Sequence, residues 1–307
     1  MATGEIKEMA NHTVLIRKDG SKVAVADSAA PLKDKNGEVA GCVVVFRDVT
    51  KERSIDKAKT EFVSLASHQL RTPLSSINWY TEMLLAGDAG KINKEQKNYL
   101  EEVYKGNKRM VDLVNALLNV SRLELGTFAI EPEPTDVVKL AQSVTDEQKP
   151  PILEKKIKLN QKYVDNLPLL NADPKLLRIV FQNLLSNAVK YTPEKGIINI
   201  DLHLVKQGEP LDTRKANEDS IAVTVSDTGY GIPKSQQDKI FSKLFRADNV
   251  REKDTEGTGL GLYIVKSIVD HSGGKIWFES TENEGTTFYI TLPLSGMKKK
   301  EGTKALA

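Results

Sequence analysis

The chain has 307 residues, of which 39% are hydrophobic and 28% charged, a composition typical of globular proteins with more than one packed domain. The formal net charge of +2 gives no reason to expect nucleic acid or an anionic membrane as a partner. Cys42 is the single cysteine, which excludes a disulfide framework and a cysteine metal site. No apolar run is long enough to cross a bilayer and no signal peptide opens the chain, so we expect a cytoplasmic segment without membrane contact. Any membrane anchor of the natural protein would lie outside this sequence.

The first 50 residues predict strands and tight turns. Residues 13–17 and 22–30 read as a hairpin, and the turn sequence Asn36-Gly37 introduces a third run of β-branched residues at 39–46. Three strands without a helix make a poor free-standing core. The ending Phe46-Arg47-Asp48-Val49-Thr50 resembles the exit of a PAS sensor domain, of which only the final hairpins are matched.

From Lys51 onward the pattern changes to helix. Apolar residues recur at three- and four-residue steps from Ile55 to Leu84 and again from Tyr99 to Val120, and a Gly-Asp-Ala-Gly sequence separates the two runs. This pattern predicts an antiparallel helical hairpin over residues 51–127. A lone hairpin cannot bury both apolar stripes, so we expect a homodimer in which two hairpins form a four-helix bundle.

Residues 128–295 alternate predicted strands and helices, so the whole chain is expected to be an α+β multidomain protein. Helices are predicted at 136–149, 174–190, 234–244 and 260–272, and strands at 157–164, 197–205, 221–227, 275–279 and 286–292. The polar stretch between Lys206 and Ser220 predicts a loop inserted between two strands. Residues 296–307 are basic and aperiodic and predict a disordered tail.

Two clusters in this last domain carry polar side chains suited to a nucleotide. Asn183 and Asn187 are four residues apart on a predicted helix, so their amides project from one face, where they can hold Mg²⁺ or phosphate oxygens with Lys190 nearby. Asp227 ends a β-branched strand, and its carboxylate can accept a hydrogen bond from a buried exocyclic amine such as that of adenine. Each feature alone is more often a solvated helix face or an ordinary Asp-Gly turn.

A third cluster contains Gly257, Gly259 and Gly261 ahead of an apolar helix. Glycines at this place expose backbone N–H groups that can bind polyphosphate. The spacing differs from the Rossmann fingerprint, and no Walker-type Gly-Lys-Ser/Thr occurs in the chain. The charged run 245–254 that precedes the glycines predicts a mobile lid.

Taken together and in this order, the motifs resemble the ATP-binding domain of bacterial sensor histidine kinases over residues 130–293. They read Asn-x-x-x-Asn-Ala-x-Lys-Tyr, Asp-x-Gly-x-Gly-Ile, Ile-Phe-x-x-Leu-Phe-Arg and Gly-x-Gly-Leu-Gly-Leu. The resemblance implies an α/β sandwich of the Bergerat (GHKL) type that binds ATP, with Mg²⁺ at Asn187 and adenine at Asp227. The nucleotide-binding residues that it implies are Asn183, Asn187, Lys190, Tyr191, Asp227, Gly229, Gly231, Ile232, Phe245, Arg246, Gly257, Thr258, Gly259, Leu260 and Gly261.

The octet Ser67-His68-Gln69-Leu70-Arg71-Thr72-Pro73-Leu74 resembles the phosphoacceptor box of the same family. Residues placed at 100° intervals put His68 almost opposite the apolar stripe, so its side chain is expected to be exposed. The resemblance implies transfer of the γ-phosphoryl group of ATP to His68 and then to an aspartate of a response-regulator receiver domain. It also implies catalytic roles for Gln69, Arg71 and Thr72, with Thr72 orienting a water for dephosphorylation of the partner.

Gln69 departs from the family pattern, in which an acidic residue follows the histidine as the proton acceptor. An amide can hold one imidazole tautomer but cannot accept a proton, so we expect phosphorylation to continue with solvent or product oxygens taking the proton. One alternative is a degenerate kinase that binds ATP and serves as a dimeric regulator. A second is an ATP-driven clamp of the chaperone or mismatch-repair type, which would lack a histidine box and carry a further transducer domain.

Overall fold

The computed structural model describes residues 7–8, 14–35, 39–164, 166–251, 257–302 and 306. The chain divides into two compact units, Met1–Val63 and Ser64–Ala307. The predicted turn at Asn36-Gly37 and the lid residues Glu252, Lys253 and Asp254 lie outside the described residues. Within the described ranges, no helix combines the length and apolar character needed to cross a membrane.

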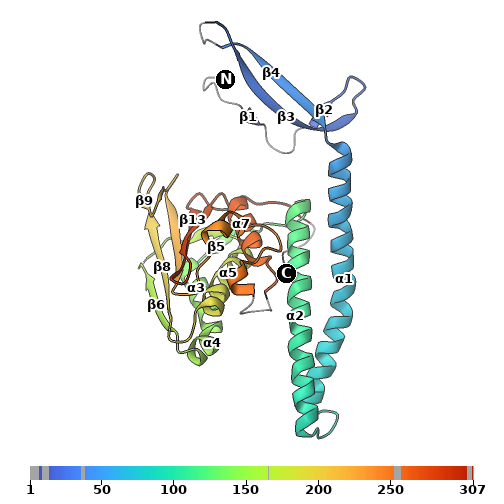
Figure 1. Ribbon diagram of the computed structural model, residues 1–307, viewed down its shortest axis with the longest axis vertical. Helices are drawn as coiled ribbons and strands as arrows, with labels where there is room; N and C mark the ends of the chain where they lie inside the picture. Colours follow the sequence, from blue (N-terminus) through green and yellow to red (C-terminus); the bar gives the residue numbers. More distant parts are fainter. Residues whose placement is uncertain are drawn as a thin grey trace. The chain divides into compact units, whose positions relative to one another are not determined.

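The first unit contains an antiparallel sheet of four strands, and the chain then enters a long helix (Figure 1). The strands are β1 (Lys7–Glu8), β2 (Val14–Ile16), β3 (Lys22–Lys33) and β4 (Val39–Asp48), and β3 pairs with the other three. Val23, Val25 and Val49 are buried, whereas the side chains at 43–46 are exposed. The predicted strands are therefore present, and the sheet leaves apolar side chains of β4 uncovered.

The predicted helical hairpin is confirmed, with α1 at Thr50–Ala86 and α2 at Lys94–Leu125. α2 begins with a capping box between Asn93 and Gln96 and ends at Gly126, whose left-handed φ of 64° stops the helix. Between the helices, Leu74 packs with Val114 and Leu118. The sequence periodicity therefore located both helices, and the ends of α2 coincide with local capping signals.

The second unit also contains a five-stranded sheet, with the strand order β12-β13-β11-β8-β6, and a layer of helices (Figure 1). Its strands are β6 (Lys158–Tyr163), β8 (Ile197–Val205), β11 (Ser220–Asp227), β12 (Lys275–Thr281) and β13 (Gly285–Pro293). Only the β6–β8 pair is parallel among the pairs of this sheet. The helical layer contains α3 (Val137–Glu147), α4 (Lys149–Glu154), α5 (Pro174–Tyr191), α6 (Asp248–Arg251), α7 (Gly261–His271) and the 3₁₀ turn η1 (Lys234–Lys239). Two short pairs, β5 (Glu133–Thr135) with β7 (Leu170–Ala172) and β9 (Pro210–Leu211) with β10 (Arg214–Lys215), complete the described elements.

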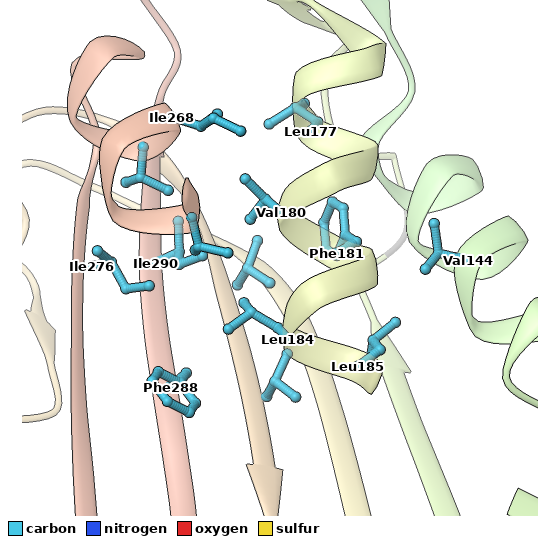
Figure 2. Close-up of a cluster of buried hydrophobic side chains, with 14 of the residues drawn as sticks. Val144, Leu177, Val180, Phe181, Leu184, Leu185, Ile268, Ile276, Phe288 and Ile290 are labelled. Atoms are coloured by element: carbon cyan, nitrogen blue, oxygen red, sulfur yellow. The ribbon is translucent and has the colours of Figure 1, made fainter. Parts of the chain in front are cut away.

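One apolar core joins α3, α5 and α7 to a single face of this sheet, and Figure 2 shows its centre. Leu177, Phe181 and Leu184 from α5 are almost fully buried, together with Ile268 from α7 and Ile290 from β13. Since side chains alternate across a strand, this face carries the inward-pointing residues of β8, β11 and β13. The predicted α/β sandwich is confirmed.

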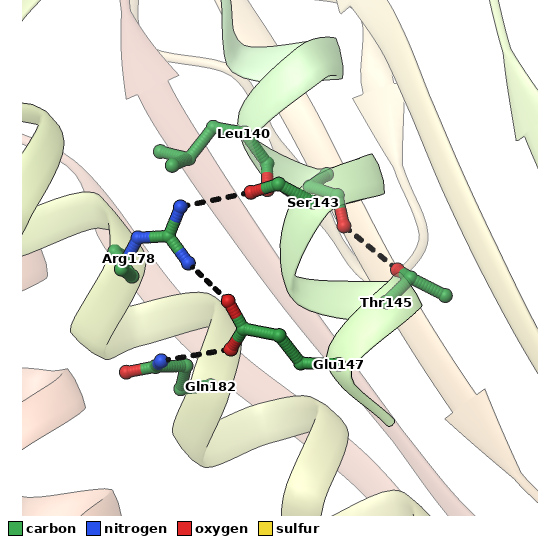
Figure 3. A network of polar contacts seen from close by, with 7 residues as sticks. Leu140, Ser143, Thr145, Glu147, Arg178 and Gln182 are labelled. Carbon is green, nitrogen blue, oxygen red and sulfur yellow. Dashed lines mark hydrogen bonds and ion pairs between the residues drawn. The ribbon is translucent and has the colours of Figure 1, made fainter. Parts of the chain in front are cut away.

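Polar contacts lock α3 against α5 at the edge of this core (Figure 3). Arg178 of α5 donates from Nη1 to Glu147 Oε1 at 2.7 Å and from Nη2 to Ser143 Oγ at 2.9 Å, and Gln182 Nε2 donates to Glu147 Oε2 at 3.2 Å. These bonds hold α5, which carries the Asn183–Asn187 face, in a defined orientation.

Three segments differ from the sequence prediction. The helix expected at 234–244 is only the short η1, which ends at Lys239, and the last expected residue, Leu244, has a left-handed φ of 58° that a helix does not adopt. The loop expected between Lys206 and Ser220 contains the β9–β10 hairpin, which covers the opposite face of the sheet through Leu211, Ala216 and Trp277.

The disordered tail expected at 296–307 is wrong for residues 296–302. Lys300 exchanges two backbone hydrogen bonds with Ile130, at 3.0 and 3.1 Å, and its ammonium group lies 4.1 Å from the centre of the Phe128 ring. Met297 and Leu306 are buried in the main core. The sequence does not predict this packing, because the segment is mostly basic and is held by backbone pairing and by isolated apolar residues.

Candidate nucleotide-binding and phosphoacceptor sites

A cavity of about 360 Å³ opens between α5, the N-terminal end of α7 and the ends of β11 and β13. It brings together thirteen of the predicted nucleotide-binding residues, which are Asn183, Asn187, Lys190, Tyr191, Asp227, Gly231, Ile232, Phe245, Arg246, Gly257, Thr258, Gly259 and Gly261. The cavity also has lining residues that sequence reasoning missed, namely Ser186, Ile240, Ala247, Val250, Leu262, Thr286 and Phe288. Segments that are far apart in the chain thus converge on one concave site.

The two asparagines of α5 differ in their surroundings. Asn183 Nδ2 donates to the Ile179 carbonyl at 2.8 Å, and its oxygen lies so close to Gly261 that a β-carbon there would collide with it. Asn187 makes no side-chain hydrogen bond within the described residues, so its amide oxygen is available to a ligand. Asn183 therefore packs α5 against α7, while Asn187 faces the cavity with an unused amide.

Lys155 supports the same end of α5, and the sequence motifs had not indicated it. Its ammonium group donates to the carbonyl oxygens of Val189, Lys190 and Thr192 at 2.8, 2.8 and 3.1 Å. Carbonyls at a helix C-terminus lack intrahelical partners and carry partial negative charge, so a cation is favourable there. Lys155 thus fixes the turn that carries Lys190 and Tyr191.

Asp227 lies at the end of β11, opposite Thr286 of β13. Burial raises the pKa of its carboxyl group to about 6, and hydrogen bonds from the backbone N–H groups of Gly229 and Thr286 offset part of that rise. The Gly229 N–H to Oδ1 distance is 2.8 Å. A buried acceptor of this kind suits a ligand that offers an N–H donor.

Two predicted residues do not line the cavity. Gly229 is not among the lining residues, and its N–H donates to the Asp227 carboxylate. Leu260 is 1% exposed and belongs to the core, at the start of α7. The Leu260 side chain therefore anchors the glycine segment in the core, because an apolar side chain at this helix start packs inward, and its role at the nucleotide stays a prediction.

The donor set of the cavity fits a magnesium ion that is held mainly by phosphate. The described residues contain no cluster of three or more His, Cys, Asp or Glu side chains that could enclose a metal ion. Mg²⁺ binds few protein groups and retains waters and phosphate oxygens as its other ligands. The free amide oxygen of Asn187 is compatible with such a site.

His68 is exposed on α1, between the buried Ser67 and the exposed Gln69. Thr72 is also exposed, whereas Arg71 is half-buried and donates from Nη2 to Asn115 Oδ1 on α2 at 2.6 Å. None of His68, Gln69, Arg71 and Thr72 lines the cavity. The exposure of the histidine agrees with the helical periodicity of the sequence.

Comparisons with known proteins match both parts of the chain. Residues 58–126 match the family described as His Kinase A (phospho-acceptor) domain, and residues 172–296 match the family described as histidine kinase-, DNA gyrase B-, and HSP90-like ATPase.

Relatives with similar sequences include the sensor histidine kinase WalK of Bacillus subtilis (strain 168), 30% identical over 91% of this chain and 44% of that protein. The sensor protein kinase WalK of Staphylococcus aureus is 32% identical over 94% of this chain and 66% of that protein. The structure of full-length ShkA in complex with AMPPNP has a TM-score of 0.62 at 26% identity, over 76% of this chain and 45% of that one. The chain thus spans less than two thirds of each of these proteins. From these two domain matches and these relatives, the chain belongs to the sensor histidine kinases of two-component signalling.

Proposed function

We propose that this chain is an ATP-dependent protein-histidine kinase that phosphorylates its own His68 and passes the phosphoryl group to an aspartate of a response-regulator receiver domain. The observation that carries the proposal is the convergence of Asn187, Asp227 and the glycine segment 257–261 on one cavity. An exposed histidine in the phosphoacceptor domain of the same chain supplies the acceptor. We place the reaction in the cytoplasm because it consumes ATP.

The cavity offers different groups to the two ends of the nucleotide. The buried Asp227 carboxyl group would accept a hydrogen bond from the exocyclic amine of adenine. Lys190, Arg246 and the glycines ahead of α7 would face the phosphates, since cations and free backbone N–H groups favour anions. Asn187 would hold Mg²⁺, which would neutralise part of the phosphate charge. Binding of AMPPNP, an ATP analogue, by the structurally similar ShkA supports the same occupant here.

In the proposed step, a nitrogen of the neutral His68 imidazole attacks the γ-phosphorus of ATP. A nitrogen–phosphorus bond forms as the bond to the β,γ-bridging oxygen breaks, and ADP leaves with the electron pair. The phosphorylated ring then loses one proton. Gln69 cannot accept this proton because its amide has no basic site at neutral pH, so solvent or product oxygens take it.

The proposed partners are a second copy of the chain and a receiver domain. The hairpin leaves a stripe of apolar residues exposed, with Tyr99, Val103, Met110 and Leu113 of α2 between 38% and 64% exposed. A second hairpin would bury this stripe in a four-helix bundle. On this arrangement Thr72, one turn after His68, would orient a water for removal of phosphate from the receiver domain.

The test is incubation with γ-labelled ATP and Mg²⁺ of the parent chain, His68→Ala and Asn187→Ala. We expect label on the parent alone, stable to base and labile to acid, because the first substitution removes the acceptor and the second the Mg²⁺ ligand. Asn187→Ala should lower the rate by at least about 100-fold.

ATP binding by the parent without any label would instead indicate the degenerate regulator. In that case Gln69→Glu would be examined, since a gain of label would identify the missing proton acceptor as the cause. Label that persists on His68→Ala would contradict the proposed acceptor.

A further inference from the structure

The turn that follows Asp227 carries the base-binding end of the cavity, and its backbone is held by a side chain from α6. We propose that Asn249 is a positioning residue that shapes this turn for the nucleobase. The inference rests on the proposed function, since it assigns the nucleobase to Asp227. Asn249 itself does not line the cavity, and the sequence analysis had included it only in the charged run 245–254, without a role of its own.

The Asn249 amide faces two main-chain acceptors. Its Nδ2 donates to the Gly231 carbonyl at 3.0 Å and to the Tyr230 carbonyl at 3.3 Å. Because both partners are acceptors, the nitrogen and not the oxygen of the amide must point toward them. The Asn249 oxygen is buried and has no hydrogen-bond partner within the described residues. The turn alone therefore determines the orientation of this side chain.

The Asn249 bond to the Gly231 carbonyl matters because the other bonds of the turn hold its neighbours. Tyr230 N–H donates to the Tyr191 carbonyl at 3.3 Å, and Ile232 N–H donates to Ser280 Oγ at 2.9 Å. Gly231 has a left-handed φ of 60°, and a β-carbon on it would collide with the Thr281 carbonyl, so its backbone is pressed against the β12–β13 turn. The Tyr230 carbonyl also accepts from Asn283 N–H at 2.8 Å. The Gly231 carbonyl, by contrast, accepts only from Asn249 among the hydrogen bonds of the described residues.

Asn249 is suited to this role because α6 is itself anchored. Asp248 N–H donates to Gln236 Oε1 at 3.0 Å, and Gln236 Nε2 donates back to Asp248 Oδ2 at 2.5 Å. Ala247 and Val250, which flank Asp248 and Asn249 in the chain, are buried and line the cavity. The amide thus projects from a fixed backbone onto the turn.

The consequence is confined to the base end of the site. Gly231 and Ile232 line the cavity next to Asp227, whereas Asn187 and Lys190 lie on α5. Loss of the two Asn249 hydrogen bonds should disturb the base end and leave the groups that face the phosphates in place. Adenosine and ADP should therefore lose affinity by the same factor, about tenfold from two neutral hydrogen bonds.

The experiment compares Asn249→Asp and Asn249→Ala with the parent in the full chain. Aspartate keeps the shape of the side chain but replaces the donor with an oxygen that repels both carbonyls, so it should have the larger effect. Asn217→Asp is the matched control, because Asn217 is exposed and makes no hydrogen bond within the described residues. Adenosine affinity is measured by NMR titration, ADP affinity by calorimetry, and autophosphorylation by initial rates over a range of ATP concentrations.

We expect KM for ATP to rise about tenfold in Asn249→Asp with kcat unchanged, equal losses for adenosine and ADP, and no change in the control. Variants that fold, as judged by thermal melting, yet bind both ligands like the parent would overturn the inference. A loss for ADP with adenosine unaffected would also overturn it, since that places the effect at the phosphates. A parent that binds neither ligand would refute the proposed function instead, so the two failures are distinguishable.

Discussion

At the scale of single residues, Asp227 carries a charge that its surroundings disfavour. Burial raises the pKa of its carboxyl group from 3.8 to about 6, although two backbone N–H groups point at it. Between these values the folded protein binds a proton that the unfolded chain has released. Stability therefore falls as the pH rises through this window. The site thus keeps a good acceptor for a ligand N–H at the expense of the stability of the unliganded protein.

The expected result is a nucleotide affinity that depends on pH below about 6. ADP should bind progressively more weakly as the pH falls from 7 to 5, by up to about tenfold, because protonation removes the negative charge from the acceptor. Calorimetric titrations at several pH values test this expectation. Asp227→Asn is the control, since it should bind weakly at every pH and be more resistant to urea than the parent at pH 7, by on the order of 2 kcal/mol. A parent whose ADP affinity is flat across this range would contradict the assignment of Asp227 to the base.

At the scale of elements, the C-terminal segment is part of the ATP-binding domain. Met297 donates its N–H to the Asn171 carbonyl at 2.8 Å, and its sulfur accepts a hydrogen bond from Asp173 N–H at 3.3 Å. Asp173 caps the start of α5 by accepting from Lys175 and Leu176. The segment thus contacts the helix that carries Asn187 at its opposite end.

Removal of the chain after Ser295 should lower the free energy of unfolding by about 3 kcal/mol, because it uncovers the core around Met297 and Leu306. Urea unfolding followed by circular dichroism measures the change. The double substitution Lys298→Ala and Lys299→Ala is the control, since both side chains are exposed and should change stability by less than about 0.5 kcal/mol. Equal midpoints for the truncated and parent chains would show that the segment contributes nothing in solution.

At the scale of the whole molecule, the apolar stripe of the hairpin predicts that two chains associate. Val103 lies in this stripe and is 49% exposed, so Val103→Glu would place a charge inside the proposed bundle. We expect this variant to be monomeric at concentrations where the parent is dimeric, because the dissociation constant of the dimer should rise by at least about 100-fold. Light scattering during gel filtration measures the mass.

Val164→Glu provides the matched control for the dimer, because Val164 is 41% exposed and follows β6 in the ATP-binding domain. The control should remain dimeric. A dimeric Val103→Glu chain would mean that the hairpin stripe is not the interface.

The sequence predicted those elements whose signals are local. β8 occupies the predicted residues, α5 differs from its prediction by one residue, and both helices of the hairpin follow the predicted runs. Apolar periodicity, a proline at a helix start and a glycine at a helix end act within a few residues, so one segment suffices to read them. The same holds for the site, where Asn187, Asp227 and the glycines belong to short motifs of distinctive composition.

The remaining features required the tertiary structure, because they depend on contacts between segments distant in the chain. The side chain of Leu260, which belongs to the predicted glycine motif, packs in the core. The basic segment at 296–302 was expected to be disordered but pairs with Ile130. Lys155 and Asn249 carry no motif, and their roles follow from which carbonyl groups the fold places beside them. The sequence by itself therefore determined the elements with strong local signals and the residue types that the cavity presents. Only the packing of those elements decided which side chains contact the cavity and which hold its walls, since backbone carbonyls exist in every segment and become specific partners only when the fold brings them together.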